Sequence, residues 1–266
     1  MTAVSYTLAT ATGSGGLVGI VLGLFGGGGS ILAVPLLVYV VGIALPHVAI
    51  GTSAVAVAFS ALGNLVPQAR AGRVKWRCAG VFALAGIVGS LAGAAAAKAV
   101  DGERLMALFG LVMIGVGLAM MRQKASAGDP QVRLSWETAP RLLPLLIGIG
   151  FTVGLFSGFF GIGGGFLIVP GLILATGMPL TYAIGTSLVG VGAFGAATAS
   201  SYAVSGLVDW TIAAVFVIGG LVGGWVGTTL GARIAARKKV LSLAFAVLVV
   251  AVGLFIVAKG LPALFG

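Results

Sequence analysis

Two long stretches without charged residues dominate the chain. Asp, Glu, Lys and Arg are absent from residues 1–69 and again from residues 142–208. A helix needs about 20 apolar residues to cross the hydrocarbon core of a membrane, so each stretch must hold more than one crossing. Four further uncharged segments, each long enough for a single crossing, are residues 78–97, 105–121, 210–232 and 240–258. The pattern predicts an all-α integral membrane protein.

The composition excludes an ordinary soluble fold. Hydrophobic residues make up 59% of the chain and charged residues 8%, whereas soluble domains carry about 25% charged residues. No basic residue precedes the first apolar stretch, so we expect this stretch to remain in the mature protein rather than to be a cleaved signal peptide. The net charge of +10 resides in loops beside the predicted helices, where it favours anionic lipid rather than nucleic acid as a partner.

The chain contains a tandem repeat. Residues 23–30 (GLFGGGGS) reappear in similar form as residues 158–165 (GFFGIGGG), and residues 49–53 (AIGTS) return unchanged as residues 183–187. Both pairs keep nearly the same separation along the chain, which chance matching of glycine-rich apolar sequence does not explain. Internal repeats of this size are typical of secondary transporters.

Loop charges predict that the two halves are inverted relative to each other. Residues 70–77 carry four basic residues, whereas the equivalent residues 206–209 carry none. Residues 98–104 are electrically balanced, whereas the equivalent residues 233–239 carry four basic residues and no acid. Because basic loops mark the cytoplasmic side, inverted halves place every basic loop on that side and both termini outside.

Inversion requires an odd number of crossings in each half, although each half shows only four apolar blocks. The first block of each half, residues 8–45 and 142–178, is interrupted by glycines, so we expect it to form a helical hairpin followed by three further transmembrane helices. The eight blocks then make up to ten passes, and full crossing or re-entry of the hairpin legs stays open. The predicted organisation is a first membrane repeat (1–121), a cytoplasmic linker (122–141) and a second membrane repeat (142–266).

The glycine runs inside the two hairpins are candidate anion sites, expected to meet near the membrane midplane. Non-helical backbone at membrane depth is tolerated only where it is buried in protein or lines a wet cavity. Glycine lets successive N–H groups converge on one ligand, and the following helix adds the partial positive charge of its first turn. The residues assigned to substrate binding on this basis are Gly27, Gly28, Gly29, Ser30, Gly163, Gly164 and Gly165. Close helix packing is the alternative explanation, preferred for the ladder Gly219, Gly223, Gly227 and Gly231.

Polar side chains in the uncharged stretches complete the candidate site. The hydroxyls assigned to substrate binding come from the duplicated AIGTS segment and are Thr52, Ser53, Thr186 and Ser187. Such hydroxyls also bond their own helix backbone, which is the alternative explanation for them. The candidate pathway residues are Asn64, Gln68 and Thr198, because polar side chains inside a membrane are costly unless they are paired. A hydrogen bond between helices is the alternative for Asn64.

The positions of the acidic residues exclude several classes of function. All five acids lie in loops or at the ends of predicted helices: Asp101, Glu103, Asp129, Glu137 and Asp209. The sequence therefore offers neither the buried proton relay of many pumps nor carboxylate ligands for multivalent cations. One Cys and one His without a buried carboxylate do not supply a catalytic centre, so we expect no enzyme activity, no metal and no cofactor.

The duplicated pattern GxxGxGG…P followed by AIGTS resembles the sulfite exporter family TauE/SafE, over about residues 15–260. The resemblance implies a multi-pass protein of the bacterial cytoplasmic membrane that moves sulfite, sulfonates or related organosulfur anions, mostly outward. The glycine turn of the family falls on residues 26–30 and 161–165, and its Gly-Thr-Ser segment on residues 51–53 and 185–187. We therefore expect an exporter of small organosulfur oxyanions. Sodium- or proton-coupled uptake of a related anion such as thiosulfate or a sulfonate is the alternative, and the oligomeric state, a homo-oligomer included, is left open.

Overall fold

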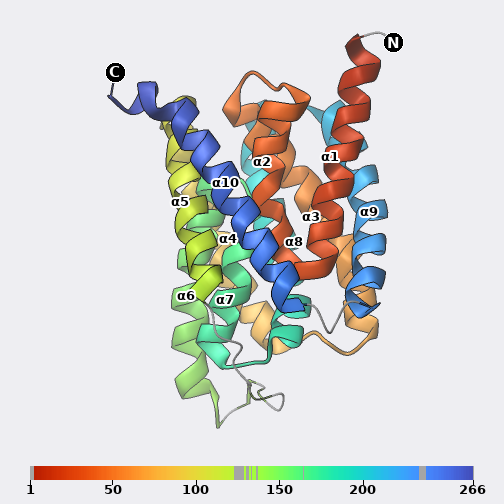
Figure 1. Cartoon of the computed structure of the whole chain (residues 1–266). Coiled ribbons are helices and arrows are strands. Elements are labelled where there is room, and N and C mark those ends of the chain that lie inside the picture. Colours follow the sequence, from red (N-terminus) through yellow and green to blue (C-terminus); the bar gives the residue numbers. More distant parts are fainter. Residues whose placement is uncertain are drawn as a thin grey trace.

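The computed structural model describes residues 3–122, 129, 132, 134–135, 137–163, 165–233 and 238–265. All regular structure in this part of the chain is helical, which confirms the predicted all-α fold (Figure 1). The helices are α1 (Ala3–Phe25), η1 (Gly26–Leu32), α2 (Ala33–Leu36), η2 (Leu37–Val41), α3 (Pro46–Arg70), α4 (Trp76–Lys98), α5 (Gly102–Arg122), α6 (Ala139–Phe160), α7 (Gly165–Thr176), α8 (Leu180–Val204), α9 (Trp210–Arg233) and α10 (Lys238–Phe265). Of these, η1 is a 3-10 helix and η2 a π-helix.

Eight of the described helices are long and apolar enough to cross a membrane. Two shorter apolar segments, Gly28–Val41 and Gly165–Thr176, each follow the first helix of a predicted hairpin. At 1.5 Å per residue, the 22 residues of α6 span about 33 Å and the 12 residues of α7 about 18 Å. Each hairpin therefore combines one full-length helix with one shorter return leg, so by length the return legs are re-entrant.

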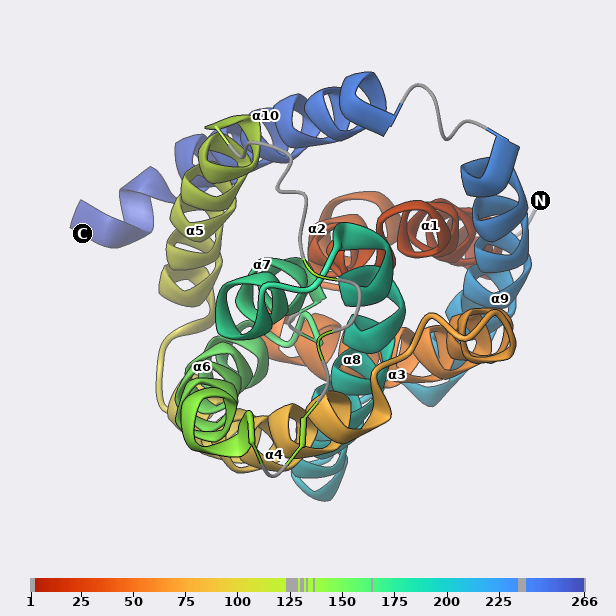
Figure 2. The ribbon, with the colours of Figure 1, turned by 90° about the horizontal axis from the view of Figure 1, so that it is seen from below.

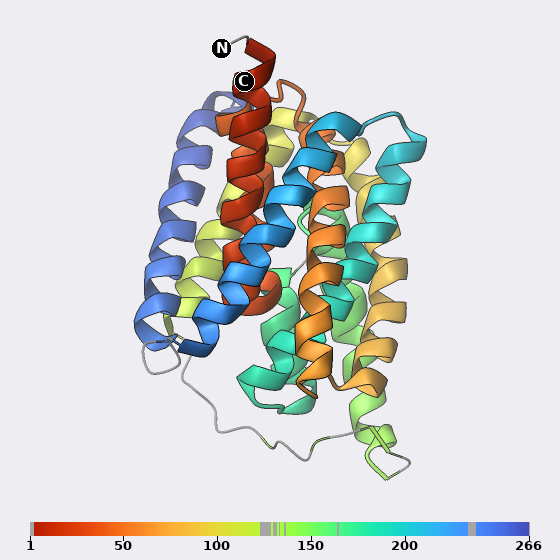
Figure 3. The same cartoon turned by 90° about the vertical axis from the view of Figure 1, so that its right-hand side faces the viewer.

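Helices of one half pack mainly on helices of the other half. α1 lies along α9 (Figure 3), and α4 lies along α6. The long helices α3 and α8 contact each other, while α5 pairs with α10. Viewed along the bundle, α7 lies inside a ring that includes α4, α5, α6, α9 and α10, while α8 starts beside α7 and runs outward to the rim near α4 (Figure 2). The second return leg is therefore enclosed by protein, as broken helical structure at membrane depth requires.

Glycines allow the backbones of two helix pairs to touch. A Cβ at Gly219, Gly223 or Gly227 of α9 would collide with the backbone of α1. A Cβ at Gly89 or Gly93 of α4 would likewise collide with the backbone of α6. The packing interpretation of the glycine ladder is confirmed at these three positions of α9, because larger side chains would push the two backbones apart. Gly231 lies beyond the residues whose packing is described.

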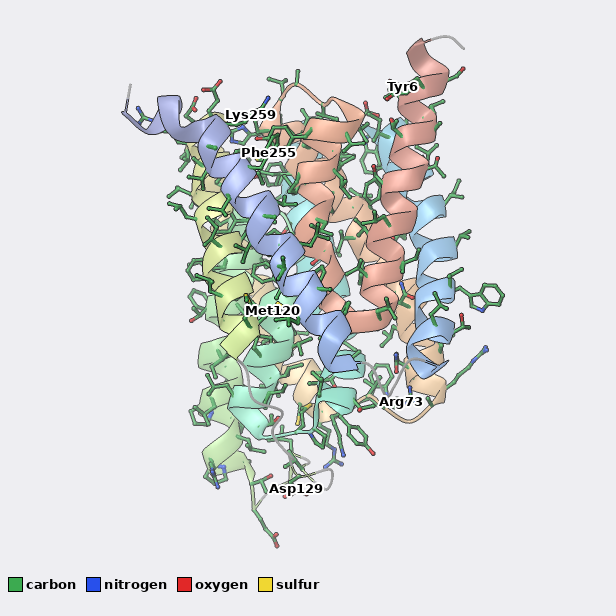
Figure 4. The ribbon with its side chains drawn as sticks, viewed as in Figure 1. Tyr6, Arg73, Met120, Asp129, Phe255 and Lys259 are labelled. Carbon is green, nitrogen blue, oxygen red and sulfur yellow. The ribbon has the colours of Figure 1, made fainter. Side chains whose placement is uncertain are left out.

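The two chain termini lie at one end of the molecule, which we call the terminal end (Figure 1). Arg73 and Asp129 lie at the opposite end, which we call the basic end (Figure 4). α1 starts at the terminal end, whereas its sequence equivalent α6 starts near Arg141, which lines one cavity together with Asp129 at the basic end. As far as they are described, the 70–77 loop and the 122–141 linker therefore share one end.

Candidate functional site

The second glycine turn connects α6 to the return leg α7. Gly161 and Gly163 have left-handed backbone conformations, with φ of 66° and 64°, which glycine adopts without strain. A Cβ at Gly161 would collide with the side chain of Ile50 in α3. The Ser53 hydroxyl donates to the carbonyl oxygen of Gly161 (2.9 Å) and, within its own helix, to that of Ile50 (2.8 Å). The turn is thus held by the AIGTS segment of the other half. Gly164 lies outside the described residues.

The first glycine turn makes an equivalent contact with the second AIGTS segment. Gly26 has a φ of 68°, and a Cβ there would lie 3.0 Å from both the carbonyl oxygen of Ile184 and the hydroxyl oxygen of Ser187. The Ser187 hydroxyl also donates to the carbonyl oxygen of Ile184 (2.8 Å). The chain then continues as η1, which contains the assigned residues Gly27, Gly28, Gly29 and Ser30. Gly29 lies directly against the backbone of α1, so the return leg starts in close contact with the first leg.

The threonines of the AIGTS segments hold loops of the opposite half. Thr52 Oγ1 accepts a hydrogen bond from the backbone N–H of Asp209 (2.9 Å), immediately before α9. Thr186 Oγ1 accepts one from the backbone N–H of Lys75 (3.0 Å), immediately before α4. The four predicted hydroxyls therefore divide into two roles in this conformation: Ser53 and Ser187 lie beside the glycine turns, and the two threonines lie beside loops.

The return leg α7 starts near the middle of the bundle. A Cβ at Gly163 would lie 3.0 Å from a methyl carbon of Val57 in α3 and 3.2 Å from one of Val191 in α8. Each valine lies about 16 Å from the first residue of its helix, which is close to half of the helix length of about 37 Å. The two helices run in opposite directions, so both valines mark the same level (Figure 1). Gly165, the first residue of α7, therefore lies close to the midplane, and α7 contacts η1 of the other return leg.

The turn residues themselves lie nearer the two ends of the molecule. Ile50 and Ile184, which contact Gly161 and Gly26, are each about 6 Å from the start of their helices. This differs from the expectation that both breaks meet at the midplane. The reason is that the first leg of each hairpin is a full-length helix that passes the midplane before it turns.

The candidate pathway residues have two kinds of surroundings. Asn64 donates to the backbone carbonyl of Ser60 (2.9 Å) and lies directly against Gly224 of α9. The side-chain carbonyl oxygen of Gln68 and the hydroxyl of Thr198 are buried without a hydrogen-bond partner in the described part of the chain. The same holds for three hydroxyls that the sequence analysis did not single out, those of Ser60, Ser157 and Tyr202. In the sequence these three residues could have been recognised as polar residues inside the uncharged stretches 1–69 and 142–208.

A half-open cavity of about 1360 Å³ lies at the basic end. It is bounded by the loop before α4, the first turns of α4 and α6, and the end of α7. Lys75, Arg77 and Arg141 contribute positive charge to its lining, and Asp129 and Glu137 contribute negative charge. The cavity therefore reaches the last residues of α7, at the end of that helix opposite to Gly165.

The groups that the centre of the bundle offers to a ligand are uncharged. Within the described ranges, no group of three or more His, Cys, Asp and Glu side chains is placed to hold a metal ion. The groups available near the midplane are backbone N–H groups at the start of α7, which a helix leaves without internal partners. Such groups can bind an anion by hydrogen bonds and by the helix dipole.

Comparison with known proteins gives the same class of protein. The family model "Sulfite exporter TauE/SafE" matches residues 11–256. A "Probable membrane transporter protein" of Xylella fastidiosa (strain 9a5c) is 49% identical over 251 residues, covering 94% of this chain and 95% of the relative. The "Probable membrane transporter protein YunE" of Bacillus subtilis (strain 168) is 30% identical over 227 residues, covering 77% of this chain and 80% of the relative. No solved structure matches the chain. The chain therefore belongs to the sulfite exporter TauE/SafE family of multi-pass membrane transporters.

Proposed function

We propose that the protein is a secondary transporter that exports small organosulfur oxyanions, sulfite- or sulfonate-like, across the bacterial cytoplasmic membrane. The observation that carries this proposal is the position of the start of α7 near the midplane, between α3 and α8. Unpaired N–H groups and aligned peptide dipoles at a helix start attract an anion without any charged side chain. An anion held in this way leaves readily, because no opposite charge retains it.

The residues assigned to the site contribute in two groups. Gly163, Gly164 and Gly165 supply the backbone donors of the second return leg, and residues 27–30 supply those of the first. The approach of Val57 and Val191 to Gly163 leaves no room for even a methyl group at that level, so binding of a solute there requires α3 and α8 to move apart. Ser53 holds the second turn by its hydrogen bond to Gly161, and Ser187 packs close to Gly26 of the first turn.

The proposal includes an inverted repeat, with residues 1–121 and 142–266 as its two membrane units. It is supported by the opposite starting ends of α1 and α6 and by the equivalent contacts that each glycine turn makes with the AIGTS segment of the other half. Because each turn is held by the opposite half, motion of one half against the other moves both return legs. Such coupled motion is what alternating access requires.

The basic end is the cytoplasmic end in this proposal, since basic residues near helix ends mark that side. The cavity beside Arg77 and Arg141 then opens to the cytoplasm and admits substrate along α7. A negative cell interior drives anions outward by about 2.3 kcal/mol per elementary charge for each 100 mV, so export needs no coupling ion.

The test is flux from proteoliposomes that contain the purified protein. Vesicles are loaded in turn with sulfite, thiosulfate, sulfoacetate or taurine, and a potassium–valinomycin diffusion potential, negative inside, is imposed. We expect efflux of at least one of the three anions sulfite, thiosulfate and sulfoacetate to accelerate with the potential, compared with protein-free vesicles. Taurine, which has no net charge at neutral pH, should not respond to the potential. Efflux of every one of these solutes at the protein-free rate would refute the proposal. Flux that follows an imposed sodium or pH gradient would instead identify coupled uptake.

A further inference from the structure

Two buried hydroxyls on α8 have no hydrogen-bond partner within the described residues. Thr198 and Tyr202 are each 0% exposed, and both side-chain oxygens are without a donor or acceptor in that part of the chain. The two residues are four positions apart and therefore lie on one face of the helix. A buried hydroxyl that makes no hydrogen bond destabilises the folded state, and an apolar side chain of the same shape would avoid this cost.

Tyr202 lies near the level of the second glycine turn, and Thr198 lies one helical turn earlier in α8. A Cβ at Gly51 would lie 2.9 Å from the Cβ of Tyr202, and the neighbouring residue Ile50 contacts Gly161. Ser157, whose hydroxyl is also buried without a partner among the described residues, precedes Gly161 by one helical turn. Tyr202 and Ser157 thus both lie near the second glycine turn, whereas Ser60, whose hydroxyl likewise lacks a partner in the described ranges, lies about 21 Å along α3, past Val57.

A cation lies beside Tyr202, at the same level of α8. The ammonium group of Lys98, the last residue of α4, lies 5.8 Å from the centre of the Tyr202 ring. It donates to the carbonyl oxygen of Ser201 (3.2 Å) and to the hydroxyls of Ser201 (3.1 Å) and Ser205 (3.0 Å). Its position is therefore determined by α8 itself. An anion that moves from α7 toward the terminal end would reach the level of Thr198 first, and then the level shared by Tyr202 and this ammonium.

We propose that Thr198 and Tyr202 form a second anion-binding station, on the terminal-end side of the midplane, in which their hydroxyls donate hydrogen bonds to the substrate oxyanion. The inference rests on the proposed function, because it assigns residues to the part of the transport path between the midplane and the terminal end. Hydroxyls donate well to anionic oxygens and add no charge of their own. The station therefore offers the oxyanion two neutral donors beside the Lys98 ammonium, whose own hydrogen bonds go to Ser201 and Ser205.

Tyr202→Phe and Thr198→Val test the station, since each removes a hydroxyl and keeps the shape of the side chain. We expect each variant to slow potential-driven sulfite efflux about tenfold, the effect of losing one hydrogen bond to a charged group. The melting temperature of the substrate-free protein is expected to stay equal or to rise, because an unpaired buried group has been removed. The matched controls are Tyr6→Phe and Thr152→Val, at exposed positions.

Slower efflux at equal or raised stability in both variants, with unchanged controls, would support the station. Wild-type efflux in both variants would overturn the station and leave the proposed function intact. A parallel loss of efflux and melting temperature would show that the hydroxyls have a structural role, and would also overturn it. If the wild-type protein itself moves no organosulfur anion, the proposed function fails and the station fails with it.

Discussion

Replacing Gly161 by Ala perturbs the second glycine turn in two separable ways. The residue has a φ of 66°, a backbone conformation that costs about 1–2 kcal/mol for a residue with a Cβ. The new methyl group would also collide with the Cγ2 methyl of Ile50, which is itself buried in α3. Overpacking of this kind costs about 1–3 kcal/mol, so we expect a total loss of about 2–5 kcal/mol in the free energy of unfolding.

Gly206→Ala is the matched control for the backbone cost. Gly206 has a φ of 69° and follows α8, yet a Cβ there would meet nothing within 4 Å. We expect this variant to lose only the backbone contribution of about 1–2 kcal/mol. The difference between the two variants therefore measures how tightly the second turn is packed against the AIGTS segment of the other half.

The assay is thermal unfolding of both variants in the same detergent, followed by size-exclusion chromatography, together with anion efflux from proteoliposomes. Gly161→Ala should melt clearly below Gly206→Ala and should transport more slowly, because the collision displaces the turn ahead of α7. In the double variant Gly161→Ala, Ile50→Ala the shortest contact, with the Ile50 Cγ2 methyl, is removed, so the loss of stability should be smaller than the sum of the two single losses. Equal melting temperatures for Gly161→Ala and Gly206→Ala, or strict additivity in the double variant, would refute the reasoning.

Two further predictions concern the contacts between the halves. Ser53→Ala removes the donor to the Gly161 carbonyl and should cost about 1–3 kcal/mol and slow transport. Ser200→Ala, which loses only a hydrogen bond to the carbonyl oxygen of Ala196 in its own helix, should change neither the stability nor the transport rate in the same assays. Gly158→Ala places a methyl group in the backbone of α4 and should cost about 1–3 kcal/mol, seen as a lower melting temperature. Gly148→Ala is the control: the space around its Cβ is open, so its melting temperature should equal or exceed that of the wild type. A wild-type melting temperature for Gly158→Ala would contradict the close packing of α6 on α4.

Much of the fold could be predicted because the decisive signals are local. The lack of charge over residues 1–69 and 142–208 identified membrane segments, since the hydrocarbon core rejects charged side chains wherever they are. The repeated glycine runs predicted breaks at the right positions, because left-handed backbone at Gly26 and Gly161 strongly favours glycine. Loop charges also predicted correctly that the loop with Arg73 and the linker with Asp129 share one end.

The candidate site was predicted less completely, because residue type alone does not report a side chain's partner. The AIGTS hydroxyls were assigned as one set, yet Ser53 holds a glycine turn whereas Thr52 holds the loop before α9. Tyr202 and Ser157 were not singled out, since a sequence does not distinguish a buried hydroxyl that lacks a hydrogen-bond partner from one that has a partner. Asn64 was assigned to the path and lies against Gly224 of α9.

The sequence by itself determined the class of protein, the repeat and the positions of the breaks, because these follow from hydrophobicity and backbone freedom, which each segment carries alone. Only the tertiary structure decided the depth of each turn, the unequal lengths of the hairpin legs and the exchange of contacts between halves. Those features depend on the register between helices more than 100 residues apart, as in the bond from Ser53 to Gly161. In a chain that is apolar almost throughout, few side chains favour one register over another, so close backbone packing at glycines and a few buried hydrogen bonds make the choice.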